Sequence, residues 1–135
     1  MCALLKQYGP FLGRVLLSII FIIAGAKKIL NFAGTAGYMA SKGLPMSEVL
    51  LVLTILIELG GGLMVLIGWQ ARWAATAIFL FLIPVTAIFH PFWADSAEFN
   101  SFFKNLAIMG GMLYIMAFGA GPISLGRDSC GKDGG

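Results

Sequence analysis

The stretch of residues 49–68 reads VLLVLTILIELGGGLMVLIG. Its length of about 20 residues is what an α-helix needs to cross the hydrocarbon core of a bilayer. The only charged residue in it, Glu58, lies near the middle. A charge at that depth costs roughly 3 kcal/mol to insert, so an ionisable residue kept there indicates a functional site.

Three further apolar runs accompany this one, at residues 10–26, 71–89 and 102–119. The sequence is 59% hydrophobic and 11% charged, whereas soluble domains carry about 25% charged residues. We therefore predict an all-α fold, an integral membrane four-helix bundle over residues 10–120. Residues 1–9 form an N-terminal segment, and residues 121–135 form a polar, glycine-rich tail.

The connection between the first and second runs is the longest one. Residues 31–41 carry Phe32 and Tyr38, and aromatic side chains of this kind anchor at the level of the lipid headgroups. Gly43-Leu44-Pro45 follows as a stop signal. The pattern predicts a short interfacial helix between spans one and two.

The N-terminal run also has features of a cleaved signal peptide, with Lys6 before it and Ala24-Gly25-Ala26 at its end. Arg14 interrupts the apolar stretch, however, and Lys27-Lys28 follows it directly. These charges favour a first helix that is retained as a membrane span.

Four retained spans bring both chain ends to the same side of the membrane. Of the 9 lysines and arginines, the side of the termini receives the larger share. By the positive-inside rule this favours a multi-pass protein of the inner or plasma membrane with both termini in the cytoplasm. Arg14 is interpreted as an anchor for this topology.

Several polar residues fall at the outer end of the predicted bundle. Lys28 closes the first span, His90 closes the third, and Asn105 lies in the first turn of the fourth. Glu58 lies deeper, roughly 15 Å from the start of its span at 1.5 Å per residue. We expect an outward-opening polar pocket with Glu58 at its floor, and with Tyr38 and Trp93 as its lid.

Each residue of this pocket is given a role. We assign proton transfer to Glu58 and His90, because histidine titrates near physiological pH. The expected ligand-binding residues are Lys28, Asn105, Tyr38 and Trp93. The structural alternatives are a pair between Glu58 and a lysine, a helix cap at His90, and an interhelical hydrogen bond at Asn105.

Several chemistries are excluded by composition. A single histidine excludes bis-histidine haem ligation within the chain. One histidine, with Cys2 and Cys130 near opposite ends, does not supply the ligands of a zinc site, so we predict no metal site. The scattered basic residues argue against nucleic-acid binding. Redox chemistry would need a borrowed cofactor or a quinone from the lipid.

Short motifs follow one another in a fixed order along residues 10–126. They are Gly13-Arg14-x-Leu16-Leu17 with Phe21-Ile22-x-Ala24-Gly25-x-x-Lys28, Gly37-Tyr38-Met39 with Gly43-x-Pro45, Glu58-Leu59-Gly60-Gly61-Gly62-Leu63 with Gly68-x-x-x-Arg72, Phe89-His90-x-Phe92-Trp93, and Lys104-Asn105-Leu106-x-Ile108-x-Gly110-Gly111. The combination resembles the DoxX family of small four-helix inner-membrane proteins. The tail departs from that family's usual ending at Ser124-Leu125-Gly126-Arg127-Asp128.

The resemblance implies a function as well as a fold. Founding members of the family are subunits of quinone-reactive oxidoreductases, and others are linked to complexes that handle sulfur compounds or oxidative stress. The resemblance thus predicts a subunit of a quinone-linked membrane oxidoreductase, either quinone-binding or non-catalytic. Its expected partners are membrane lipid, other oxidoreductase subunits, or copies of itself. The alternatives are a small proton-coupled transporter and a structural or assembly subunit.

Overall fold

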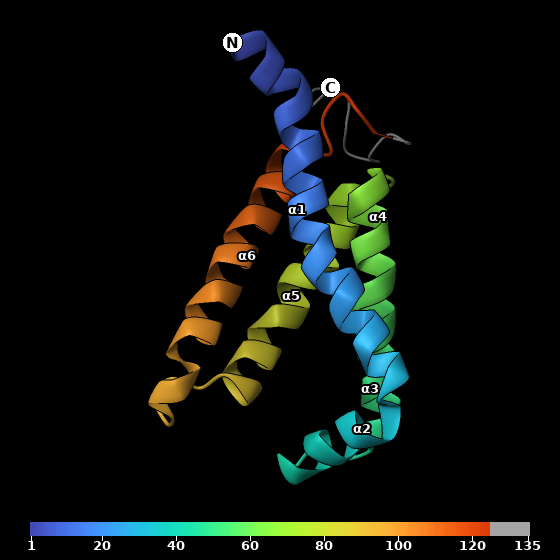
Figure 1. Ribbon diagram of the computed structural model, residues 1–135, viewed down its shortest axis with the longest axis vertical. Helices are drawn as coiled ribbons and strands as arrows, with labels where there is room; N and C mark the ends of the chain where they lie inside the picture. Colours follow the sequence, from blue (N-terminus) through green and yellow to red (C-terminus); the bar gives the residue numbers. More distant parts are fainter. Residues whose placement is uncertain (125–135) are drawn as a thin grey trace.

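The computed structural model describes residues 1–124, and within them every regular element is a helix. In this range four helical segments are long and apolar enough to cross a membrane. They are α1 (Cys2–Leu30), the segment Ser47–Ile67, α5 (Ala71–Phe89) and the segment Ser96–Phe118 (Figure 1). The predicted all-α membrane bundle is confirmed. Residues 125–135, with Cys130 and most of the departing tail motif, lie outside the described range.

The first span and the short helix after it follow the predicted order. Helix α1 begins at Cys2 rather than at Pro10, so residues 2–9 continue the span as helix. Helix α2 (Phe32–Ser41) lies across one end of the bundle, as predicted for an interfacial helix (Figure 1). It ends before Gly43, whose positive φ of 84° reverses the chain toward the second span.

The second span is not one regular α-helix. It consists of α3 (Ser47–Ile55), a π-helical turn η1 (Leu56–Gly60) and α4 (Gly61–Ile67). A π turn holds one residue more than an α turn, and such turns occur mostly at functional sites. Glu58 is the middle residue of this turn. The sequence pattern had predicted an uninterrupted α-helix here.

The helices form two pairs that meet at one end. Helix α1 packs along the second span, and α6 (Phe99–Phe118) packs along α5, whereas α1 and α6 diverge toward the α2 end (Figure 1). A short connection joins the pairs: α4 ends at Ile67 and is capped by Gly68, whose φ is 76°, and α5 begins at Ala71. Near this connection, small residues of α5 such as Ala75 let α4 and α5 approach closely.

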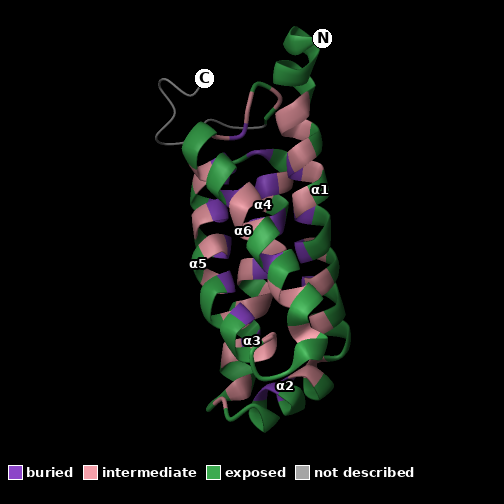
Figure 2. Ribbon diagram, turned by 90° about the vertical axis from the view of Figure 1, so that its left-hand side faces the viewer, coloured by how far each residue is buried: buried purple, intermediate pink, exposed green. Residues whose placement is uncertain are grey.

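Buried residues follow the inside of the bundle, and the outer surface is apolar (Figure 2). Large side chains such as Leu16, Leu80 and Tyr114 are exposed. In water such a surface would drive aggregation. On segments that span a membrane, it is the surface that contacts lipid tails.

Arg14 is buried in this interior, with 2% of its surface exposed. Its guanidinium donates hydrogen bonds to the carbonyl oxygens of Val65 at 3.0 Å and Leu66 at 2.9 Å, and to the carbonyl of Ile123. These carbonyls at the end of α4 carry partial negative charge, which a cation stabilises. Arg14 therefore ties the first span to the second, beyond the topological role expected from its position.

A close approach between α1 and the π turn sets the position of the pocket residues. A Cβ atom added at Gly25 would lie 2.9 Å from Leu59 Cβ and 3.2 Å from the Leu59 backbone nitrogen. Only glycine fits at this distance. The contact places Lys28, one turn further along α1, opposite Glu58.

We predict that Gly25→Ala lowers the free energy of unfolding by about 1–3 kcal/mol, because the added methyl group overpacks the contact with the Leu59 backbone. Gly13→Ala is the matched control in the same helix, since nothing lies within 4 Å of a Cβ at Gly13. The control should be neutral or slightly stabilising. Thermal unfolding in detergent, followed by circular dichroism, measures both. Equal melting temperatures for the two variants would contradict this account of the contact.

Candidate functional site

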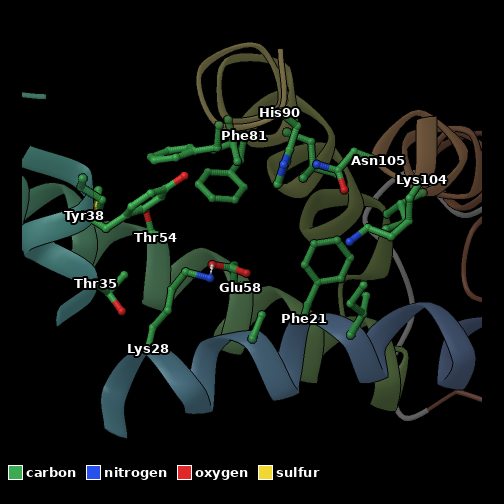
Figure 3. A pocket seen from close by; sticks show the side chains of 17 residues that line it. Phe21, Lys28, Thr35, Tyr38, Thr54, Glu58, Phe81, His90, Lys104 and Asn105 are labelled. Atoms are coloured by element: carbon green, nitrogen blue, oxygen red, sulfur yellow. Dashed lines mark ion pairs between the residues drawn. The ribbon is translucent and has the colours of Figure 1, made fainter. Parts of the chain in front are cut away.

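A cavity of about 290 Å³ lies at the α2 end, where the two helix pairs diverge. All four spans and α2 contribute to its walls (Figure 3). Most of its lining is apolar, including Phe21, Phe81 and Leu82. The ionisable or amide side chains that line it are those of Lys28, Tyr38, Glu58, His90, Lys104 and Asn105.

Lys28 and Glu58 form an ion pair across the first two spans. Lys28 Nζ lies 2.8 Å from Glu58 Oε1. The Glu58 side chain is 8% exposed and that of Lys28 is 28% exposed, so the lysine is the partner that reaches the open part of the pocket. The pair keeps a buried carboxylate neutralised and puts an acceptor and a donor side by side at the wall (Figure 3).

His90 is held by an acid from the connection between α5 and α6. Its Nδ1 lies 2.6 Å from Glu98 Oε2, and Glu98 belongs to the short helix η2 (Ser96–Glu98). A carboxylate at Nδ1 orients the ring and leaves Nε2 available to another partner. Figure 3 shows the ring of His90 pointing into the pocket. The sequence analysis did not single out Glu98.

Asn105 joins the two helices of the second pair. Its Nδ2 donates a hydrogen bond of 3.1 Å to Oγ1 of Thr86, and both residues are buried. The interhelical hydrogen bond considered as a structural alternative is therefore present. Asn105 also lines the pocket, so the two roles coexist.

Tyr38 and Trp93, the predicted lid residues, are found in different environments. Tyr38 lines the pocket and stacks on Phe89, with ring centroids 5.6 Å apart. Trp93 is 63% exposed, contacts Phe92 and Phe102 edge-on, and is absent from the residues that line the pocket. The aromatic wall at the α2 side is thus formed by Tyr38 and Phe89.

Lys104 also lines the pocket, and no role there was predicted for it from the sequence. It lies in α6 directly before Asn105 and contributes to the lining. Across residues 1–124, no three His, Cys, Asp or Glu side chains gather closely enough to hold a metal ion.

This architecture and its motifs can now be compared with known proteins. The DoxX family model matches residues 9–91, which is more than half of the chain. The chain belongs to the DoxX family. It is therefore a multi-pass integral membrane protein.

Two relatives are named as inner membrane proteins. YqjF of Escherichia coli is 38% identical over 91% of this chain and 93% of its own length. YphA of the same organism is 31% identical, and the match covers 86% of each chain. A Surfeit locus protein 4 homolog of Schizosaccharomyces pombe is 28% identical over 89% of this chain but only 37% of its own length. No solved structure matches the chain.

We predict that Lys28→Met costs about 3 kcal/mol or more of stability, because it leaves the Glu58 carboxylate buried without a counter-charge. Glu58→Gln should cost less, since the more exposed Lys28 can turn toward water. The double variant should be more stable than Lys28→Met alone. Equilibrium unfolding in mixed detergent micelles measures the free energies of unfolding of the unmodified protein, the two single variants and the double variant. Lys27→Met, at an exposed neighbouring position, is the control; a loss as large there as at Lys28 would contradict the role of the pair.

Proposed function

We propose that this DoxX-family protein is a quinone-binding subunit of a membrane oxidoreductase. The observation that carries the proposal is the pocket: an apolar cavity with a few polar side chains, the usual form of a small-molecule site. Its volume of about 290 Å³ suits a single ring system rather than a whole lipid-soluble molecule. A quinone headgroup is such a ring, and it reaches the site from the bilayer.

The divergence of α1 and α6 offers room for the apolar tail of a quinone. On this side the pocket is lined by Ile20 and Ala24 of α1 and by Ile108 of α6. Beneath the pocket the interior is packed, with Val65 and Met112 fully buried. This supports a dead-end binding site more than a path through the membrane, and so favours ligand binding over transport.

The polar groups match the chemistry of a quinone. Reduction to a quinol takes up two electrons and two protons, and the two carbonyl oxygens accept hydrogen bonds throughout. Tyr38 and His90 lie on different walls, and Tyr38 supplies a hydrogen-bond donor, while Glu58 and His90 are the groups that transfer protons. The electrons come from a partner oxidoreductase subunit. With both termini in the cytoplasm, the pocket opens toward the outer side of the membrane.

We predict that a quinone co-purifies with the protein and that Ile108→Trp removes it, because the larger side chain fills the pocket. Leu106→Trp is the matched control, since Leu106 is 41% exposed and lies outside the lining. Native mass spectrometry after gentle extraction from the membrane measures bound quinone in both variants. Equal quinone occupancy in the two variants, or no quinone in the unmodified protein, would argue against the pocket as the quinone site.

We further predict that Glu58→Gln and His90→Ala each lower quinone-dependent electron transfer in native membranes by at least about tenfold, a typical effect of losing a proton-transfer group. The Trp93→Phe control should keep full activity, because Trp93 lies outside the pocket lining. Protein levels in the membrane are measured in parallel. Unchanged turnover in both variants would refute the proton-transfer roles.

A further inference from the structure

Lys104 differs from the other basic groups of the pocket in having no acidic partner. Lys28 is paired with Glu58, and His90 is paired with Glu98. Within residues 1–124, Lys104 has neither an ion pair nor a hydrogen bond from its side chain. Lys104 is therefore the basic side chain of this pocket that has no acidic partner among residues 1–124.

The position of Lys104 directs that charge at a ligand. Figure 3 shows the ammonium group of Lys104 turned into the cavity, near the ring of Phe21 and on the side of Asn105. Lys104 is an exposed residue of α6, and the cavity walls beside it are mainly apolar. A lysine that only sets membrane topology extends its ammonium group toward water. A topological role therefore does not explain why the ammonium group of Lys104 is turned into the cavity.

A second group with an unused donor faces the same cavity. The hydroxyl of Tyr38 makes no hydrogen bond among the described residues, and it lies on the α2 side of the pocket. The threonines of that side are already engaged, since Thr35 and Thr54 donate to the carbonyls of Asn31 and Leu50. Lys104 and Tyr38 therefore each offer a hydrogen-bond donor to a ligand, and Lys104 is a cation.

We propose that the pocket selects amphipathic organic anions, with the anionic oxygen bound at Lys104 and the apolar body against Phe21 and Phe81. Charge-assisted hydrogen bonds are roughly twice as strong as neutral ones, so an ionised ligand binds more tightly than its neutral analogue. The inference rests on the proposed function in that the pocket is a ligand site. It adds that the ligand is an anion. A quinone with an ionised ring hydroxyl meets this requirement, and a neutral quinone does not.

The test compares three probes on the purified protein in lipid nanodiscs at neutral pH. The probes are naphthoquinone, hydroxynaphthoquinone in its ionised form, and dodecanoate, and dissociation constants are measured by isothermal titration. We expect hydroxynaphthoquinone to bind at least about tenfold more tightly than naphthoquinone, as a hydrogen bond to a charged group implies. Lys104→Gln should remove this preference and leave the affinity for naphthoquinone within about twofold, and Lys104→Arg should retain it.

The control variant is Lys27→Gln, which removes a lysine from the same end of the bundle but outside this pocket. It corrects for the attraction of anions to the surface of the protein. Equal affinities for the two naphthoquinones, or equal losses in Lys27→Gln and Lys104→Gln, would overturn the inference.

The outcomes separate this inference from the proposed function. If naphthoquinone binds without any preference for the anion, the quinone site stands and the anion selectivity is wrong. If dodecanoate binds in a Lys104-dependent way and neither naphthoquinone binds, the anion site stands and the quinone proposal is wrong. If none of the three probes binds, both are wrong.

Discussion

The ion pair between Lys28 and Glu58 joins two membrane spans and gives the buried Glu58 carboxylate its counter-charge. It is one of two cationic links that α1 makes to the second span, and the other is the hydrogen-bonded fork of Arg14 at the end of α4. Between these two links α1 passes Leu59 at the distance that only Gly25 allows. Helix α1 and the second span are therefore held together by three separate contacts along their length.

The other half is held differently, and the pocket results from that difference. Helices α5 and α6 are joined by packing and by the hydrogen bond from Asn105 to Thr86, and at the α2 end by His90 and Glu98. The two halves meet through the short connection after Gly68 and diverge toward α2. The interior is packed around Val65 and Met112, and polar groups from both halves face the pocket at the α2 end.

The sequence was sufficient to predict the four-helix membrane fold because hydrophobic length is a local signal. It also identified Glu58, Lys28, His90 and Asn105 as neighbours, since helices of known rise bring the ends of successive spans to one level. It did not predict Glu98 as the partner of His90, or the direction of the Lys104 side chain. Both depend on how the loop between α5 and α6 folds and on side-chain rotamers, which no periodicity encodes. Trp93 was expected at the pocket, but the same loop turns it toward the aromatic residues outside.

The π turn at Leu56–Gly60 means that the second span contains one residue more than an α-helix of the same path would need. Deleting a single residue there would return the span to regular α-helix and leave the residues beyond it in their present register, because the wider turn absorbs the extra residue. Gly61 and Gly62 would still face Ile78 and Ile22. The direction of the buried acid can therefore change without repacking the far half of the helix, so a one-residue gap within this segment of an alignment would mark relatives whose acid is presented differently.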